Sequence, residues 1–366
     1  MTGERTGKKI GEMGARPTAK GIVIALVLGC VLTLLAAEGV LRIVIPHWRD
    51  FYSGWFMRVI DVPGHGRVTT GRPGFDGYFA QNNGDFRVRI RVNDFGLRNP
   101  EPVDKAAGRI WFVGDSMTFG WGVEQDEIYS AVAGRALGVA VYNVASPGAN
   151  VCGYQALVAR MPAATRPRAV VVGLILENDV AQYDCKATVE RSTTAKERRG
   201  ADKTFNAIAF KRFLTRNTAL YNFFAVALKR VGFLRDALVS VGLIEKGHAY
   251  KRRLSDSEFE SATEGTAAEL DTLRNMLPPA TPFAVLIAPT RFEIRDGDPF
   301  SRTLRQTMAG ALARRGIPAI DPTDAFKAAG FGPSHFAHDG HWSSLGHEIA
   351  GRAAAEWLQT RNKAKK

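Results

Sequence analysis

From residue 109 onward the chain alternates short apolar runs with amphipathic segments, and this alternation limits its fold more than any other feature. The runs, each of strand length, are residues 110–113, 140–144, 169–176, 283–288 and 317–320. Segments with helical periodicity lie near residues 126–137, 154–163, 256–277, 300–315 and 343–358. Strands that alternate with helices in this way form parallel sheets covered on both faces. The sequence therefore predicts an α/β fold with a central parallel sheet and right-handed crossovers.

The first apolar run ends in the tripeptide Gly114-Asp115-Ser116. Residues 110–113 contain no polar side chain, which suits a strand buried on both faces. Gly114 lets the backbone turn tightly, and Asp and Ser commonly start helices. A serine just past the carboxyl end of such a strand projects into the crevice where open α/β sheets bind ligands. Ser116 is therefore a candidate nucleophile, although the same residues also suit a simple helix cap.

Two groups that can stabilise a developing negative charge follow the next two strands. Gly148, just after the second strand, lets a substrate approach the backbone closely and offers an N–H as donor. Asn178, in the Glu177-Asn178-Asp179 segment after the third strand, offers a side-chain amide. Each segment also suits an ordinary turn, so neither is decisive alone.

A polar cluster near the C-terminus, Asp339-Gly340-His341-Trp342, leads into the last predicted helix. In an extended loop, side chains two apart point the same way, so Asp339 could orient His341 as a base. Four of the seven histidines lie in this region: His335, His338, His341 and His347. A metal-dependent hydrolase that uses this cluster is an alternative, but the spacing matches no closed zinc motif, so we predict no metal. We expect the other three histidines to be surface or helix-capping residues.

In their order and spacing, these four blocks resemble those of the SGNH/GDSL hydrolase family, across about residues 105–360. The resemblance implies a three-layer α/β/α fold. It implies a nucleophile at Ser116, a base at His341 and an orienting acid at Asp339. It also implies an oxyanion hole made by the Ser116 N–H, the Gly148 N–H and the Asn178 side chain. Many members carry Asp-x-x-His where this chain has Asp-x-His, and Glu177 stands where a smaller residue is usual.

The Asp-x-His-Trp form is similar to the branch of this family that includes bacterial alginate O-acetylation proteins. That similarity implies a serine esterase or O-acyltransferase acting on acyl, especially acetyl, esters of a carbohydrate or cell-envelope polysaccharide. It implies no cofactor and suggests a membrane-bound O-acyltransferase as partner. Water or a sugar hydroxyl could resolve the acyl-enzyme, and both acceptors stay open. A catalytically inactive polysaccharide-binding or scaffold protein of an acetylation complex is the other alternative.

Residues 21–37 form an uncharged apolar stretch near the N-terminus. With the apolar residues up to 45 it reaches roughly the 20 residues that span a lipid bilayer. Basic residues precede it, which favours a cytoplasmic N-terminus and a translocated remainder. Glu38 and Arg42, four apart, can pair where the helix leaves the hydrocarbon. A cleaved signal peptide, or a lipoprotein modified at Cys30, is the alternative.

These features predict the domain organisation of a bacterial inner-membrane protein whose catalytic domain is periplasmic. We expect a cytoplasmic tail at 1–20, a transmembrane helix at 21–45, a lead-in appendage at 46–108 and the catalytic domain at 109–360. Within the appendage, residues 86–92 alternate like an edge strand with its arginines outward, followed by a turn at residues 93–96.

The net charge of +13 is concentrated in a segment, residues 186–253, that interrupts the alternation. This segment holds sixteen Lys and Arg but only five Asp and Glu. An evenly basic nucleic-acid binder is therefore a poor fit, and we predict no nucleic-acid partner. Its first part, to about residue 203, is predicted to be a loop, and residues 205–244 resemble one or two amphipathic helices. These helices pack on the sheet domain or, alternatively, form a lid or a surface for anionic lipid, an anionic polymer or a membrane partner.

Cys152 and Cys185 each follow one of two successive predicted strands, on the side of the crevice. An oxidising compartment would permit a disulfide between them. Two free buried thiols are the alternative.

Overall fold

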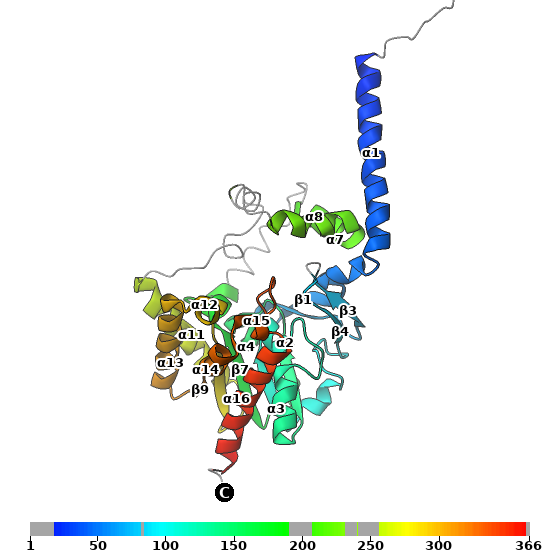
Figure 1. Ribbon diagram of the computed structural model, residues 1–366. Coiled ribbons are helices and arrows are strands. Elements are labelled where there is room, and N and C mark those ends of the chain that lie inside the picture. The colour runs from blue at the N-terminus through cyan, green and yellow to red at the C-terminus, as the bar shows by residue number, and fades with distance from the viewer. Residues whose placement is uncertain (1–17, 82–83, 190–206, 231–239, 241–255, 364–366) are drawn as a thin grey trace, which may run out of the picture.

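The computed structural model describes residues 18–81, 84–189, 207–230, 240 and 256–363 (Figure 1). Most of the predicted N-terminal tail lies outside these residues. The loop expected from residue 186 is wrong for residues 186–189, which are helical, and residues 190–206 lie outside the described residues. The part of the insert after residue 230, apart from residue 240, also lies outside them.

The core is a five-stranded parallel sheet with the strand order β6-β5-β7-β8-β9. Its strands are β5 (Ile110–Gly114), β6 (Val141–Ala145), β7 (Ala169–Ile175), β8 (Phe283–Ala288) and β9 (Ala319–Ile320). In the register, Val113 lies opposite Val144 of β6 and Val172 of β7. The chain reverses its winding direction between β6 and β7, which opens a crevice at the carboxyl ends of β5 and β7. The predicted α/β class with a central parallel sheet is confirmed.

Helices cover both faces of this sheet, so the core has three layers (Figure 1). They are α3 (Tyr129–Leu137), α4 (Val151–Ala159), α11 (Asp256–Asn275), α13 (Pro299–Arg314) and α16 (Ser344–Lys363). Helices α4, α11 and α13 share one apolar cluster with Trp111 and Val113 of β5. Helices α3 and α16 share another with Ile110 and Phe112. Successive side chains of a strand point to opposite faces, so the unbroken apolar run of β5 contributes side chains to both clusters.

Short helices surround the carboxyl edge of the sheet. They are α2 (Ser116–Phe119), α5 (Leu176–Asp179), α12 (Arg291–Asp296), α14 (Thr323–Ala329) and α15 (Phe331–Ser334). The long helices lie within a few residues of the predicted ranges. The largest shift is at the end of α16, which continues five residues beyond the predicted range. Helix α4 begins three residues early because the Asn150 side chain accepts from the Gly153 N–H at 3.1 Å and caps it.

The segment before the sheet contains two β-hairpins and three short 3₁₀ helices. The strands are β1 (Met57–Val62), β2 (Gly66–Gly71), β3 (Asp76–Ala80) and β4 (Arg87–Arg91), and the 3₁₀ helices are η1 (Trp48–Phe51), η2 (Ser53–Trp55) and η3 (Val103–Ala106). Strand β4 alternates buried Val88 and Ile90 with exposed arginines, as expected. An aromatic cluster that contains Phe56 and Phe79 packs this segment against Phe119 of α2. The appendage therefore contacts the segment that carries Ser116.

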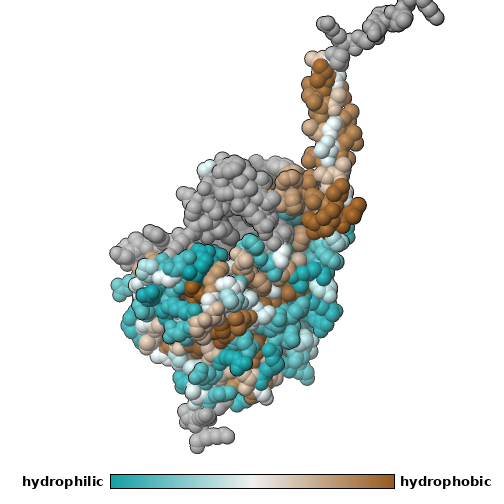
Figure 2. Space-filling view, viewed as in Figure 1, coloured by the Kyte–Doolittle hydropathy of each residue, from teal (hydrophilic) through white to brown (hydrophobic). Residues whose placement is uncertain are grey.

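Helix α1 (Ala19–Val44) projects from the globular part as an apolar column (Figures 1 and 2). Among the described residues it is the one helix long and apolar enough to cross a membrane, a test that an N-terminal signal sequence also passes. Glu38 and Arg42 form the expected ion pair at 2.7 Å. Residues 207–230 of the basic insert form the helices α7 (Ala207–Asn217) and α8 (Ala219–Arg230) beside the end of α1.

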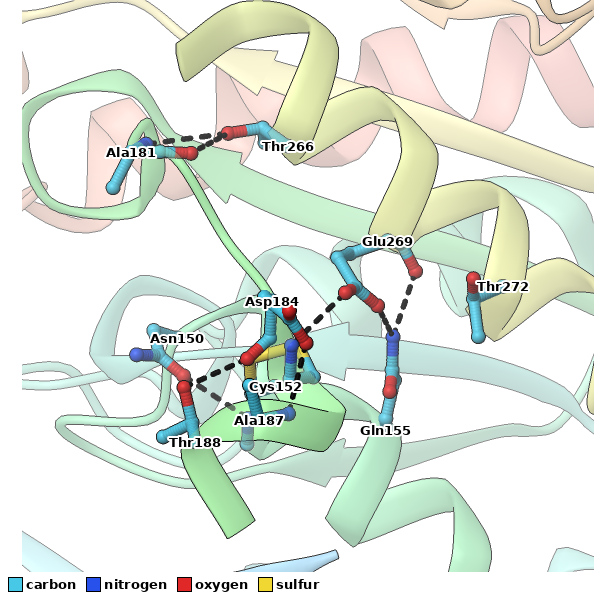
Figure 3. The surroundings of a disulfide bond; sticks show 12 residues. Asn150, Cys152, Gln155, Ala181, Asp184, Ala187, Thr188, Thr266, Glu269 and Thr272 are labelled. Atoms are coloured by element: carbon cyan, nitrogen blue, oxygen red, sulfur yellow. Dashed lines mark hydrogen bonds between the residues drawn. A yellow bond between two sulfur atoms is a disulfide. The ribbon is translucent and has the colours of Figure 1, made fainter. Parts of the chain in front are cut away.

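A disulfide bond joins Cys152 of α4 to Cys185 at the start of the insert (Figure 3). Glu269 of α11 lies against this bond, where its carboxylate accepts from the Cys185 N–H at 3.0 Å and from the Gln155 amide at 2.7 Å. The segment that leads into the basic insert is thereby tied to α4 and α11, on one face of the sheet.

Candidate active site

Ser116 is the first residue of α2, directly beyond the carboxyl end of β5. The Asp115 carboxylate caps this short helix by accepting from the Met117 N–H at 3.0 Å. Gly114 is needed for a reason other than the predicted tight turn. A Cβ at this position would meet the Thr118 hydroxyl at 2.1 Å and the Gly173 carbonyl at 3.0 Å. The missing side chain lets α2 fold back over the end of β5.

A chain of contacts runs from Ser116 to Asp339. The His341 Nε2 lies 2.8 Å from the Ser116 Oγ, and the His341 Nδ1 contacts the Asp339 Oδ1. A ring with its proton on Nδ1 would donate to Asp339 and leave Nε2 free to accept from the serine. The expectation of an extended loop is wrong, because Asp339 lies in a turn and Gly340 has a φ of +83°. This left-handed conformation favours glycine and brings the His341 ring back onto the carboxylate.

The Asp339 carboxylate is well supplied with donors. Burial by itself would raise its pKa. The hydrogen bonds from the His341 ring, the His341 N–H and the Gln81 amide outweigh burial, and its pKa lies below the ordinary value. Asp339 therefore stays ionised at neutral pH and can orient and stabilise a protonated His341.

The loop between β3 and β4 supplies the residues that hold the Asp339 turn. The Gln81 Nε2 donates to the Asp339 Oδ2 across 258 positions of sequence. The Asp85 carboxylate contacts the His338 ring at 2.7 Å and accepts from the His338 N–H at 3.0 Å. Neither side chain could be predicted from the sequence, because a Gln and an Asp in a turn-rich stretch carry no local signal of such distant contacts. The predicted appendage thus forms one wall of the candidate site.

Replacing Gln81 by leucine is expected to lower kcat for ester hydrolysis by about 10-fold, with little change in KM. The substitution keeps the size of the side chain but leaves one oxygen of a carboxylate only 10% exposed without its donor. A double-mutant cycle with Asp339→Asn provides the control, since coupled residues have non-additive effects. If Gln81→Leu lowers kcat by the same factor in the wild-type chain and in Asp339→Asn, Gln81 does not act through Asp339.

The loop after α2 covers the other side of the histidine. The Trp121 ring stacks on the His341 ring with centroids 5.7 Å apart. The fully buried Arg98 holds this loop by donating to the carbonyls of Gly120 at 2.5 Å and Val123 at 2.8 Å. Burial lowers the pKa of Arg98 to about 9, so the guanidinium is still charged at neutral pH. Arg98 and Trp121 thereby fix the face of His341 that packs away from solvent.

The two remaining predicted oxyanion donors line different cavities. Asn178 is exposed and lines a cavity of about 290 Å³ together with Asp339 and His341. Gly148 is exposed with a φ of +76° and lines a second cavity of about 250 Å³ beside Cys152. Within the described chain, neither residue makes a hydrogen bond to Ser116. Their roles, and the roles of the triad residues, remain predictions.

Glu177, the residue before Asn178, has a structural role beside this cavity. Its carboxylate accepts from the Arg291 N–H at 2.6 Å, at the start of α12, and pairs with the Arg291 guanidinium at 3.1 Å. An acidic side chain at a helix N-terminus is favourable. This ion pair adds charged groups to a cavity wall that also contains apolar residues such as Met117 and Ile175.

The other histidines of the C-terminal cluster have separate partners. His347 is fully buried and caps α3 by accepting from the Tyr129 N–H at 3.2 Å, and burial lowers its pKa to about 3. His338 is exposed and pairs with Asp85, as described. The expectation of a surface or helix-capping residue is wrong for His335, because this side chain is buried against Phe331. Burial lowers the pKa of His335 to about 4. Among the described residues, no group of three or more His, Cys, Asp or Glu is placed to hold a metal ion.

Two carboxyl groups are buried behind the nucleophile. Burial, and then the charge of Asp179, raise the pKa of Asp115 well above its ordinary value. Burial also raises the pKa of Asp179, although it accepts from the Tyr154 hydroxyl at 2.6 Å and from the Ile175 N–H at 2.8 Å. Two nearby carboxyl groups in a dry site do not both ionise readily. The pair thus retains a proton at a pH where an exposed carboxyl has lost it.

Replacing Asp179 by asparagine is expected to remove one contribution to the dependence of stability on pH. A carboxyl whose pKa is raised on folding contributes stability below the ordinary value of 3.8 and loses it as the pH rises through the folded value. From pH 5 to pH 8 this contribution should therefore fall by about 2 kcal/mol, while the contribution of His335 and His347, whose pKa values are lowered by burial, rises over the same range.

The asparagine variant keeps an acceptor for Tyr154 and Ile175 but cannot ionise, so its melting temperature in detergent should rise relative to that of the wild-type chain from pH 5 to pH 8. Asp126→Asn, at an exposed site, is the matched control and should keep the wild-type slope. An unchanged slope in Asp179→Asn would contradict the raised pKa.

Comparison of the sequence with protein-family models and with curated proteins finds no match in either case. Solved structures with a similar arrangement include G-D-S-L lipolytic proteins and carbohydrate esterases. A lipase/acylhydrolase from Enterococcus faecalis is 14% identical with a TM-score of 0.40, over 69% of this chain and 96% of that chain. A carbohydrate esterase family 2 enzyme with its carbohydrate binding domain, from Corynascus thermopiles, is 15% identical with a TM-score of 0.38, over 72% and 67%. An acetylxylan esterase from Geobacillus stearothermophilus, in a catalytic mutant, is 15% identical with a TM-score of 0.37, over 68% and 93%.

Proposed function

We propose that this chain is a membrane-anchored, extracytoplasmic serine esterase or O-acyltransferase that acts on acetyl or other acyl esters of a carbohydrate or cell-envelope polysaccharide. The observation that supports this proposal most is the chain of contacts from Ser116 through His341 to Asp339, with 2.8 Å between the His341 Nε2 and the Ser116 Oγ. A serine hydroxyl is a weak nucleophile until an adjacent base takes its proton, and His341 is in reach to do so.

The reaction proceeds in two steps. The Ser116 Oγ attacks the acyl carbon as His341 takes the hydroxyl proton, and donors at the Ser116 N–H, Gly148 and Asn178 stabilise the oxyanion. Each well-placed donor contributes about 3–4 kcal/mol in related chemistry. The leaving alcohol then takes the proton from His341 and departs. Water or a sugar hydroxyl gives a proton to His341 and attacks the acyl-serine, which regenerates Ser116.

The proposed substrate and location follow from the surroundings of this chain of contacts. The lining of the cavity beside His341 includes hydrogen-bonding side chains such as Asn178 and Arg291, which suit an acceptor rich in hydroxyl groups. A disulfide bond supports an oxidising compartment such as the periplasm. With α1 as an uncleaved anchor in the bilayer, a membrane-bound O-acyltransferase is the proposed partner that supplies the acyl group.

The proposal is tested by trapping the acyl-enzyme. The full chain in detergent is mixed with p-nitrophenyl acetate, quenched in acid and mapped by peptide mass spectrometry, with and without a neutral oligosaccharide. We expect acetyl on the peptide that contains Ser116, and its later appearance as acetate or as acetylated sugar. If nitrophenol is released without formation of acetyl-Ser116, and a chelator abolishes this release, the proposal is overturned in favour of a metal-dependent hydrolase.

A further inference from the structure

The helical pair α7–α8 is bound to the end of α1 through two charged side chains. The Glu38 carboxylate accepts from the N–H groups of Ala219 at 2.9 Å and Leu220 at 2.7 Å, at the N-terminus of α8. Arg42 donates to the Asn217 carbonyl at 2.9 Å, at the C-terminus of α7. These contacts pair each charge with the helix end of opposite partial charge. The turn between α7 and α8 is therefore fixed to one turn of α1.

That turn of α1 lies where a membrane span would leave the hydrocarbon. Residues 21–37 are uncharged, and at 1.5 Å per residue they extend about 26 Å, close to the thickness of the hydrocarbon core. Glu38 is the first charged residue after them. Two tryptophans follow in the chain. The Arg42 guanidinium carbon lies 5.0 Å from the centroid of the Trp48 ring, and the Arg216 guanidinium carbon lies 4.6 Å from that of the Trp55 ring. Tryptophan and arginine at this level are typical of a membrane–water interface.

The pair α7–α8 has the composition of helices that lie on a bilayer. Four phenylalanines on it are between 44% and 59% exposed: Phe210, Phe213, Phe223 and Phe224. The sequence of the two helices contains five Lys and Arg and no Asp or Glu. In Figure 1, α8 runs crosswise to α1, which is the direction of the membrane plane. An amphipathic helix in this plane places aromatic side chains among the acyl chains and basic ones beside anionic headgroups.

We infer that α7–α8 binds the surface of the anionic bilayer that α1 spans, as a second membrane contact of this chain. The inference rests on the proposed anchoring by α1. The bilayer is preferred to a protein partner because Glu38 and Arg42 place the pair at the depth of the interface. In Figure 1, α2 and α15 lie on the side of the sheet toward α1, and the C-terminal end of α16 lies on the opposite side. Two contacts would thus hold the crevice that contains Ser116 toward the membrane.

The inference is tested with the full chain in nanodiscs of phosphatidylcholine and phosphatidylglycerol, with no other protein. Nitroxide labels are placed at Phe213→Cys and at Phe224→Cys in a Cys30→Ser background. Collision rates with oxygen, which enriches in lipid, and with a water-soluble nickel complex are measured by power saturation. We expect the ratio of oxygen to nickel accessibility at both positions to exceed, several-fold, the ratio at an aqueous control, Gln359→Cys, near the C-terminal end of α16.

Native Cys30, labelled in the otherwise unchanged chain, reports on α1 itself and separates the two ways in which the inference can fail. If both phenylalanine positions are as accessible to nickel as Gln359→Cys while Cys30 is protected in lipid, the inference is overturned and the anchor stays intact. Nickel accessibility at Cys30 would overturn the proposed anchoring, and the inference with it. Cys152 and Cys185 are joined in the disulfide and take up no label.

Discussion

Replacing Ser116 by alanine is expected to lower kcat for hydrolysis of p-nitrophenyl acetate by about 10⁶-fold, to the residual rate that binding and the oxyanion donors support without a nucleophile. The Ser116 Oγ is the atom that lies 2.8 Å from the His341 Nε2, and alanine offers no atom that can attack an acyl carbon. The loss should appear in kcat, because the substituted hydroxyl takes part in bond formation and the pocket stays open. Stopped-flow release of nitrophenol, together with intact mass of the quenched chain, measures both turnover and acylation.

Ser146 provides a matched control for this substitution. It is also buried near the carboxyl edge of the sheet, and its hydroxyl has no hydrogen-bond partner in the described part of the chain. Ser146→Ala is expected to keep kcat within a few-fold of the wild-type value. Activity that survives in Ser116→Ala would remove Ser116 as nucleophile.

Replacing Asp339 by asparagine is expected to lower kcat by about 10⁴-fold. The Asp339 Oδ1 contacts the His341 ring, and the Oδ2 accepts from the Gln81 amide. An asparagine has one acceptor oxygen, so it can satisfy only one of these donors and turns an NH₂ group toward the other. His341 then loses either its tautomer or its orientation, and no negative charge stabilises its protonated form. Steady-state rates at several pH values measure the loss.

Asp85 allows a direct comparison, because it forms the other Asp–His contact of the same region. Its carboxylate contacts His338, which is 53% exposed and is not in contact with Ser116. Asp85→Asn is expected to lower kcat by about 10-fold or less. A loss as large as that of Asp339→Asn would mean that the turn as a whole, and not the Asp339 charge on His341, supports catalysis.

Much of the core and the three triad candidates could be predicted because each depends on a short pattern in the chain. Residues 110–113 contain no polar side chain and form a strand buried on both faces. Ser116 follows that strand by two positions, and Asp339 and His341 are two residues apart, so local order already places reactive groups at strand ends and in one turn. The close packing of Gly114 against Thr118 could not be predicted, because it depends on how α2 folds back.

The partners of these residues were decided by the tertiary structure. Gln81 reaches Asp339 from a hairpin 258 positions away, and neither residue belongs to a periodic pattern that links the two. The pairing of Asp115 with Asp179 depends on β5 and β7 being neighbours in the sheet, although β6 lies between them in sequence. Periodicity reports which face of an element is apolar, but it contains no information about which polar groups of distant segments meet.

The sequence by itself determined the parallel sheet, the apolar N-terminal helix and the residues with reactive side chains, because burial periodicity and residue chemistry are local properties. Only the tertiary structure decided that the appendage forms a wall of the site, that Arg98 holds the loop over His341, and that Glu38 and Arg42 bind the basic helices to α1. These contacts each join segments whose proximity follows from the packing of the whole chain, and a buried or shared polar group is satisfied only once that packing is complete.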